Sequence, residues 1–424
     1  MRRPCDLFRA TVASFINAQV WLCRMETNVT LPLTNIRVLD MTRALTGPYC
    51  TQMLGDMGAD IIKVEQPNVG DNSRAWGPPF VNGESTYFMS INRNKRSLTL
   101  DLRHPDAATI MRELIAQSDV VIENFVPGQM TKYGFDYAAC KTIKPDIVYC
   151  SISGFGQIGP DHHRAAYDQV IQGLGGVMSV TGYPDGDPMR VGIALSDIIS
   201  GLNAAYAIMV AVYHRQMTGV GQNIDTSLLS GQLAMMSYHA AAYLATQHVP
   251  QRTGNHNPEI APYGVFQAKD GWFNLAVGTN ALWQKFAIAL HAPQLLSDPR
   301  FATNGLRSEH YDDLKAALGA IFSTYTVRQL EDILLPAGIP IGEIHDMGSV
   351  FADPQVNAMH QVLIIPHPKA GDLRVVGAPY VFSETPATVR HHPPLLGEHT
   401  DEILAQVGFT ADQIAAFRAS GALG

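Results

Sequence analysis

One acidic residue in a long apolar stretch is the first candidate for chemistry in this chain. Asp197 stands in RVGIALSDIISGLNAAYAIMV and is the only charged residue between Arg190 and His214. A carboxylate is costly to bury without partners, so its presence needs a reason. One interpretation is structural, because Ser196 or Asp197 could cap the N-terminus of a helix. The other is chemical, because an ionised, partly desolvated carboxylate can act as a nucleophile.

Other motifs with possible chemistry are weaker. The stretch GFGQIG (154–159) matches the GxGxxG pattern, but PDHHRAAYD follows it instead of a helix that could bind a pyrophosphate. It is better interpreted as a glycine-rich loop that could line a crevice. The pairs His162-His163 and His391-His392 lack metal-ligand spacing, so no metal is expected. The chain contains no GxSxG elbow and no cysteine with an obvious histidine partner, so covalent chemistry would need another nucleophile.

The composition is that of a globular protein. The chain has 424 residues, of which 46% are hydrophobic, and a net charge of -8. This length allows a large core and two domains. The mild acidity gives no reason to expect a nucleic acid or an anionic membrane as a partner. The 5 cysteines are an odd number without CxxC spacing, which favours a reduced, intracellular compartment.

Two segments bear on location. Residues 1–24 contain arginines and a short apolar patch, but Asp6 and the lack of a clear cleavage site weaken the pattern of a transit peptide. We therefore expect a simple extension and a cytoplasmic protein, with a mitochondrial location if the segment is a transit peptide. The apolar run 198–212 is shorter than the roughly 20 residues of a membrane span. It is interpreted as a buried helix, and no membrane partner is expected.

The elements that must position Asp197 alternate along the first half of the chain. Strands are expected at 36–41, 60–65, 97–102, 119–125 and 146–153, with helices at 47–58 and 104–118. Short β-branched runs that alternate with helices predict βαβ units and a parallel sheet. Right-handed crossovers then give a doubly wound, Rossmann-like α/β domain.

The second half has a different character. We expect a long helix at 230–248, a β-hairpin at 262–278 with its turn at Asp270-Gly271, and short helices at 281–290, 312–325 and 327–338, which form a smaller α+β domain. The tail has a strand-like segment at 372–382 and two final helices, with Thr400 as an N-cap. The predicted organisation is an extension (1–30), a large domain (31–228), a linker helix (229–252), a small domain (253–345) and a return linker that completes the large domain (346–424).

From about Leu31 to its end, the chain resembles the class III CoA-transferases, the group that contains formyl-CoA:oxalate and carnitine CoA-transferases. The resemblance rests on motifs that occur in the family's order: VLDMTRALTGPYCTQMLGDMGADIIKVEQPNVGD, NKRSLTLDLR, DVVIENFVPGQMTKYGF, SISGFGQIGP, AAYDQVIQGLGGVMSVTG, GIALSD and LLGEHTDEIL. The segments RTGNHNPEIAPYGVF, FADPQV and HPKAGDLRVVGAP are similar to those of members that act on dicarboxylates such as succinate and glutarate.

The resemblance implies a role for Asp197. In the family the nucleophilic aspartate ends a G-x-x-L-x-D motif, which here is GIALSD (192–197). The related acyl-CoA racemases use a histidine in GHD, where this chain has Tyr167-Asp168, so the acid/base pair for racemisation is broken. The family also implies an interlinked homodimer, with the active site between a large and a small domain.

The family's CoA site and acceptor site carry over by position. The first loop supplies Leu45 and Thr46, where formyl-CoA transferases have a Gln-Ala pair, and Arg103 and Lys132 are candidate phosphate partners. The full set expected to bind CoA is Leu45, Thr46, Leu100, Asp101, Leu102, Arg103, Asn124, Phe125, Lys132, Ala165, Ala166, Tyr167 and Asp168. The mobile GGGGQ loop of formyl-CoA transferases is missing, and His256, Asn257 and Tyr263 are the acceptor-site candidates near that place.

The resemblance thus implies transfer of CoA from an acyl-CoA, with succinyl-CoA expected, to a dicarboxylate through an aspartyl anhydride and an aspartyl-CoA thioester. No metal and no tightly bound cofactor are expected, since the CoA thioester is a substrate. Two alternatives stay open: an acyl-CoA racemase or epimerase of the same fold, and a non-catalytic CoA-binding protein.

Overall fold

The larger unit is built on a six-stranded parallel sheet. The computed structural model describes residues 30–424. The strands run in the order β5-β2-β1-β6-β7-β8, and every neighbouring pair is parallel. Their bounds are β1 Arg37–Asp40, β2 Asp60–Glu65, β5 Lys95–Thr99, β6 Val120–Glu123, β7 Val148–Ser153 and β8 Asn223–Ser227. In chain order this is 3-2-1-4-5-6, so the connection reverses direction between β1 and β6, where ligands bind in such sheets.

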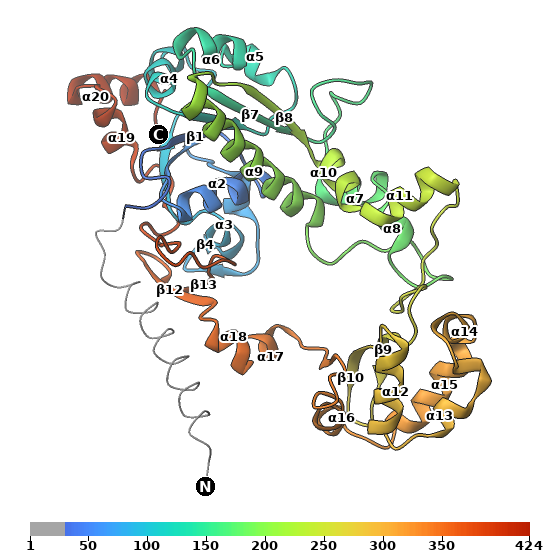
Figure 1. Cartoon of the computed structure of the whole chain (residues 1–424). Helices are drawn as coiled ribbons and strands as arrows, with labels where there is room; N and C mark the ends of the chain where they lie inside the picture. The colour runs from blue at the N-terminus through green and yellow to red at the C-terminus, as the bar shows by residue number, and fades with distance from the viewer. Residues whose placement is uncertain (1–29) are drawn as a thin grey trace. The chain divides into compact units, whose positions relative to one another are not determined.

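Helices cover both faces of this sheet, which confirms the predicted doubly wound α/β architecture (Figure 1). The principal helices are α2 Thr46–Asp56, α4 Ala107–Ala116, α9 Leu195–Thr218, α19 Thr400–Gln406 and α20 Ala411–Ser420. Val38 of β1 joins the core under α2 and α9, whereas its neighbour Leu39 joins the core under α4. Alternate residues of a strand point to opposite faces, so one strand supports both cores.

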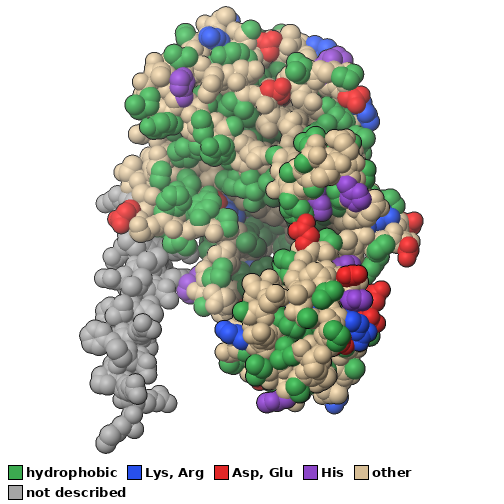
Figure 2. Space-filling view, turned by 45° about the vertical axis from the view of Figure 1, so that its right-hand side comes forward, with side chains coloured by type: hydrophobic (Ala, Val, Ile, Leu, Met, Phe, Trp, Pro, Cys, Tyr) green, Lys and Arg blue, Asp and Glu red, His purple; other side chains and the backbone are tan. Residues whose placement is uncertain are grey.

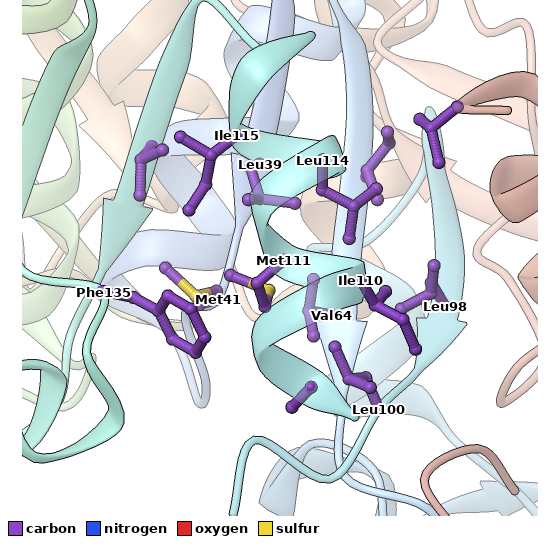
Figure 3. Packing of buried hydrophobic residues seen from close by; sticks show 14 of the residues in the cluster. Leu39, Met41, Val64, Leu98, Leu100, Ile110, Met111, Leu114, Ile115 and Phe135 are labelled. Carbon is purple, nitrogen blue, oxygen red and sulfur yellow. The ribbon is translucent and has the colours of Figure 1, made fainter. Parts of the chain in front are cut away.

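The packing under α4 follows from its sequence. Its apolar residues recur at helical spacing, so they form one stripe. Figure 3 shows Ile110, Met111, Leu114 and Ile115 directed from the helix onto side chains of the strands. Those side chains include Leu39, and all of these residues are buried in one cluster. This packing holds the ends of β1 and β2 in place.

Shorter elements complete the larger unit. They are η1 Asn72–Ala75, α3 Thr86–Ser90, α5 Gln129–Tyr133, α6 Tyr137–Ile143, α7 Asp168–Leu174 and α10 Leu228–Met235, with the hairpins β3 Phe80–Val81 with β4 Glu84–Ser85 and β12 Val362–His367 with β13 Gly371–Val376. The loops that end at η1 and α7 both border the candidate site.

The smaller unit has an antiparallel sheet, β11-β10-β9, and its own aromatic core. Its elements are α8 Val177–Val180, α11 Ser237–Thr246, β9 Tyr263–Gln267, β10 Trp272–Ala276, α12 Asn280–Ala289, α13 Gln294–Ser297, η2 Pro299–Phe301, α14 Asn304–Glu309, α15 Tyr311–Phe322, α16 Val327–Leu334, β11 Ile341–Glu343, α17 Met347–Ala352 and α18 Pro354–Ala358. The predicted hairpin is confirmed, and the N–H of Ala268 donates to the carbonyl of Gly271 across its turn.

The two compact units take several segments each. Among the described residues, the larger one contains 30–175, 192–237 and 360–424, and the smaller one contains 176–191 and 238–359. These units differ from the predicted ranges in three places. Residues 176–191 and 346–359 both group with the smaller unit, and the predicted linker helix 229–252 is divided between the two units after residue 237.

Three local predictions are wrong. The helix expected at 230–248 is two helices, because Ser237 has a φ of +40° that an α-helix cannot accommodate. Thr400 is the first residue of α19 and not its N-cap, which is His399. The third is the prediction that the run 198–212 is a buried helix. It belongs to α9, which is 24 residues long and is, among the residues described, the one helix long and apolar enough to cross a membrane. It is also not wholly buried, since 44% of its most apolar window is buried inside the structure.

Candidate active site at the carboxyl ends of β1 and β6

A cavity of about 510 Å³ lies at the point where the strand order reverses. Its lining comes from the segments that follow β1 and β6, from the loop before α7 and from the first turn of α9. Eight of the residues predicted from the sequence line it: Thr46, Asn124, Phe125, Ala165, Ala166, Tyr167, Asp168 and Asp197. The topology therefore brings together residues that lie far apart in the chain.

Asp197 belongs to the first turn of α9 but does not cap it. The N-cap position is Ala194, and no side chain caps it, so the structural interpretation of Asp197 as an N-cap is wrong. Instead, the hydroxyl of Thr46 donates to Asp197 Oδ1 at 2.5 Å. Among the residues described, none donates a hydrogen bond to the second oxygen, Oδ2. That oxygen is available to a molecule in the cavity.

The environment of Asp197 raises its pKa. Burial raises the pKa from its ordinary 3.8 to about 6, and the nearby Asp168 carboxylate adds to the increase. The hydrogen bond from Thr46 acts in the opposite direction. A pKa of about 6 leaves the carboxylate ionised at neutral pH, while its higher basicity makes it a better nucleophile.

Asp168 orients the start of α9. Its Oδ1 accepts from the backbone N–H of Ser196 at 2.8 Å, and its Oδ2 accepts from Gln172 at 2.7 Å. The N–H of Ser196 lies in the first turn of α9, where backbone donors have no partner inside the helix. Asp168, at the start of α7, therefore caps α9 in place of a residue of its own N-terminus. The Ser196 hydroxyl in turn donates to Gln232. Asp197 is therefore held by contacts of its sequence neighbour as well as by Thr46.

The segments after β1 and β6 are tied to each other. The N–H of Arg43 donates to Asn124 Oδ1, and Asn124 Nδ2 donates to the Arg43 carbonyl, both at 2.8 Å. The Arg43 guanidinium lies 4.9 Å from the centre of the Phe125 ring. Arg43 was not among the predicted residues, although it lies only two positions before the predicted Leu45-Thr46 pair.

A smaller cavity of about 80 Å³ shares Arg43 and Phe125 with the larger one. It is lined by all four residues of the LDLR motif, Leu100, Asp101, Leu102 and Arg103. The Arg103 guanidinium is paired with Asp101 through two contacts of 2.9 Å. The shared residues make the two cavities neighbours, which is a suitable arrangement for an elongated ligand.

Two predicted CoA contacts line neither cavity. Leu45 is buried at the start of α2, and Lys132 is exposed on α5. The structure thus brings together most of the predicted set but not these two residues.

The three acceptor-site candidates lie in the smaller unit. The ring of His256 stacks on Tyr311 at 4.2 Å, and burial lowers the pKa of this histidine. Asn257 Oδ1 accepts from the N–H groups of Glu259 and Ile260. Tyr263 is the first residue of β9. Each of these contacts is made inside that unit.

Two aromatic residues that line the cavity with Asp197, Trp76 and Tyr87, were not predicted from the sequence. Trp76 and Tyr87 line the cavity and contact each other edge to face at 5.0 Å. Burial, the Asp197 carboxylate and the Asp168 carboxylate together raise the pKa of Tyr87 to about 12. Arg164 also lines the cavity, where it pairs with Asp161. The signal for these residues was weak, since Trp76 and Tyr87 lie in the Pro- and Gly-rich loop region between β2 and β5.

The other side chains that could carry chemistry are metal ligands and cysteines. Residues 30–424 contain no group of three or more His, Cys, Asp or Glu side chains suited to a metal ion. The cysteines described, Cys50, Cys140 and Cys150, are buried, and burial raises the pKa of each thiol. The group best placed for covalent chemistry is therefore the Asp197 carboxylate.

Comparison with known proteins shows which family the chain resembles. The model of CoA-transferase family III matches residues 33–400. A succinyl-CoA:glutarate CoA-transferase of Mus musculus is 42% identical over 379 residues, with 89% of this chain and 86% of that protein covered. A succinate–glutarate CoA-transferase of Agrobacterium fabrum is 40% identical, with 89% and 96% covered. The crystal structure of a CAIB/BAIF family protein from Brucella suis has a TM-score of 0.81 at 40% identity, with 89% and 99% covered.

Proposed function

The chain belongs to CoA-transferase family III, and from this premise we propose that it moves CoA from succinyl-CoA to a dicarboxylate acceptor, with Asp197 as the nucleophile. The observation that carries the proposal is the Asp197 carboxylate itself. It lies in the cavity at the strand reversal, with one oxygen held by Thr46 and the other free of described donors. The named activities of the relatives support the choice of donor and acceptor.

In the first half of the reaction, a carboxylate oxygen of Asp197 attacks the thioester carbonyl carbon. The C–S bond breaks, CoA leaves as a thiolate, and an acyl-aspartyl anhydride forms. The thiolate then attacks the carbonyl carbon of Asp197. The anhydride C–O bond breaks, the donor acid leaves as a carboxylate, and CoA is held as an aspartyl thioester.

The second half runs through the same species with the acceptor. The acceptor carboxylate attacks the aspartyl thioester and releases the thiolate, which then attacks the acceptor carbonyl of the new anhydride. The new acyl-CoA forms and Asp197 is regenerated. No proton is consumed in any step, so the site needs no general acid and needs above all to exclude water from the activated intermediates.

CoA would reach Asp197 along the two neighbouring cavities. Arg43 borders both, and its cationic group is suited to a phosphate or a thioester carbonyl. Arg103 borders the smaller cavity, and there it would share or give up its contact with Asp101 to bind a phosphate. Lys132 lies on the exposed surface, where it would contribute through its charge.

A homodimer is part of the proposal. One side of α9 exposes Leu202, Tyr206, Val210, Tyr213 and Met217, each more than a third exposed. Their spacing of three or four residues puts them on one face of the helix. The space-filling view also shows hydrophobic side chains in patches on the visible surface, with fewer charged ones (Figure 2). A second copy of the chain would cover this face, which water would otherwise contact.

The remaining expectations stay proposals. We propose a cytoplasmic protein without a nucleic-acid or membrane partner, and the packing of Ala204, Ile208 and Val212 of α9 into the core supports a non-membrane role for that helix. Residues 1–24, on which a mitochondrial location would depend, lie outside the described residues. CoA is proposed as part of the substrates, with no tightly bound cofactor.

A panel of acceptors tests the substrate proposal. The enzyme is incubated with succinyl-CoA and glutarate, malate, oxalate, acetate or octanoate, and the CoA esters formed are identified by mass spectrometry. We expect transfer to at least one C4–C6 dicarboxylate at a kcat/KM at least about tenfold above that for acetate, since a second carboxylate adds a charge-assisted contact. Equal transfer to all acids, or to none of the dicarboxylates, would contradict the proposed substrate class.

The alternative of a racemase has its own test. A racemase exchanges the α-proton of a 2-methylacyl-CoA with solvent, whereas a transferase of the proposed mechanism leaves it in place. Exchange in deuterated water without an acceptor acid would favour the racemase. Tyr167 supports the transferase, because a tyrosine stands where the acid/base histidine would be needed.

The pH dependence should show the ionisation of Asp197. Because burial raises the pKa of Asp197 to about 6 and the reaction needs the ionised form, kcat/KM is expected to fall about tenfold per pH unit below that value. A second acid needs a control, since burial raises the pKa of Glu123 to about 7 and its carboxylate accepts from the N–H of Phe125. The fall in kcat/KM at low pH is the acid limb of the profile. If this limb persists in Glu123→Gln, it reports the ionisation of Asp197. If the limb disappears in that variant, it reports the ionisation of Glu123.

A further inference from the structure

A buried ion pair lies next to the loop that carries Thr46. The side chains of Lys63 and Asp71 have no exposed surface, and Lys63 Nζ is 2.8 Å from Asp71 Oδ2. A buried ion pair is a weak source of stability, because the cost of removing both charges from water can exceed their attraction. A role in stability alone therefore does not explain the pair, and its other contacts indicate a second role.

Both members of the pair bind the backbone of loop 42–46. Lys63 Nζ donates to the Thr42 carbonyl at 2.8 Å, and Asp71 Oδ1 accepts from the N–H of Ala44 at 3.0 Å. Ala44 has a φ of +67°, in the left-handed region that a non-glycine residue adopts only at an energetic cost. The two contacts hold this strained turn in place.

The turn decides where the Thr46 hydroxyl lies. Thr46 follows Ala44 by two residues and makes the hydrogen bond of 2.5 Å to Asp197. The turn is also fixed at its start, since Asp40 Oδ1 accepts from the N–H and the hydroxyl of Thr42. Relaxation of Ala44 to a right-handed conformation would redirect the chain after it and move Thr46 from Asp197.

We propose that Asp71, with its charge held by Lys63, is a positioning residue that locks the left-handed turn at Ala44 so that Thr46 can hydrogen-bond the nucleophile. The proposal rests on the proposed function of Asp197. Asp71 is not among the residues that line the cavity, so it acts on the reaction through the loop. Its two carboxylate oxygens bind different groups: Oδ2 binds Lys63, and Oδ1 accepts from the N–H of Ala44 and also from the N–H and hydroxyl of Ser73 at the start of η1.

The variant Asp71→Asn tests this division. An amide has one acceptor oxygen and one donor group, so it cannot accept from both Lys63 and Ala44. We expect kcat to fall about tenfold and the acid limb of kcat/KM to move up by about one pH unit, because the Thr46 hydrogen bond no longer favours the ionised Asp197. The rate is measured over a range of pH in wild type and variant.

The matched control is a second buried ion pair in the same unit. Arg93 Nη2 lies 2.6 Å from Asp56 Oδ2, and both side chains have almost no exposed surface. Neither residue lines the cavity. Asp56→Asn should lower the midpoint of thermal unfolding and leave the acid limb at its wild-type pH. A limb that moves equally in both variants would show a general effect of a lost buried charge and would overturn the proposal.

A second pair of variants leaves the buried ions intact, in case Asp71→Asn does not fold. Valine is β-branched and adopts a left-handed conformation poorly, whereas asparagine of similar size tolerates it. We therefore expect Ala44→Val to shift the acid limb as Asp71→Asn does, and Ala44→Asn to keep the wild-type limb. An unshifted Ala44→Val, or an equal shift in Ala44→Asn, would overturn the proposal. Absence of transfer by the wild type, or full transfer by Asp197→Asn, would instead refute the proposed function.

Discussion

Asp197→Asn should lower kcat for CoA transfer by at least about a thousandfold, because an amide oxygen cannot form the anhydride that carries the acyl group. The amide has the same shape as the carboxylate and can still accept from Thr46, which donates to Oδ1 in the wild type. The loss would therefore be chemical. The assay is transfer from succinyl-CoA to the best acceptor of the panel, followed by separation of the CoA esters.

Thermal unfolding of the same variant distinguishes lost chemistry from lost structure. Because the folded-state pKa of Asp197 is raised, the neutral carboxyl favours the fold at low pH, and this contribution is lost as the pH rises through about 6. Asparagine stays neutral, so the variant should unfold at a temperature no lower than the wild type above pH 7, and at an equal temperature near pH 4. The difference between 3.8 and about 6 corresponds to at most about 3 kcal/mol, and to less for a side chain that solvent partly reaches.

Two results would contradict the assignment. Transfer by Asp197→Asn within about tenfold of the wild-type rate would require another nucleophile. Covalent capture gives independent evidence: with succinyl-CoA and no acceptor, the peptide that contains Asp197 should gain the mass of CoA less water. Label on any other peptide would refute the proposed mechanism, although not the membership of the family.

The sheet could be predicted from sequence because its strands are short, β-branched and separated by amphipathic helices. The positions of β2 and β7 agree closely with the prediction, since both are buried on two faces and rich in β-branched and aromatic residues. The break between α10 and α11 could not be predicted, because it depends on the backbone of Ser237, a residue that sequence patterns allow inside a helix. The exposed side of α9 was also missed, since an apolar helix has the same composition whether a core or a partner chain covers it.

The residues of the candidate site also differ in whether they could be predicted from the sequence. A local motif was enough to single out Asp197, because GIALSD places it at a helix start within one segment. Arg43, Trp76 and Tyr87 have no such motif, and they reach the cavity only because parallel strands bring their loops to one edge of the sheet. The hydrogen bond between Thr46 and Asp197 joins residues 151 positions apart, so its formation follows from the packing of α2 on α9.

Gly201→Ala should disrupt this packing and with it the reaction. Alanine in place of glycine inside a helix ordinarily stabilises by about 1 kcal/mol. Here an added Cβ would lie 2.7 Å from the backbone oxygen of Thr46, which cannot rotate away. The helices α2 and α9 would have to separate, so we expect a loss of about 1–3 kcal/mol of stability and of at least about tenfold in kcat.

Gly319 offers the matched control, because it lies inside α15 and an added Cβ would meet nothing within 4 Å. Gly319→Ala should raise the midpoint of thermal unfolding and leave the transfer rate unchanged. The same substitution thus has opposite effects at two helical glycines, and the difference isolates the contact with Thr46 from helix propensity. Gly201→Ala could instead stabilise the protein and keep its activity. That result would mean that α2 and α9 are not in close contact at this point, so the helix contact would not hold the Thr46 hydroxyl on Asp197. The orientation of the nucleophile would then depend on the loop alone, held by Asp71 at Ala44.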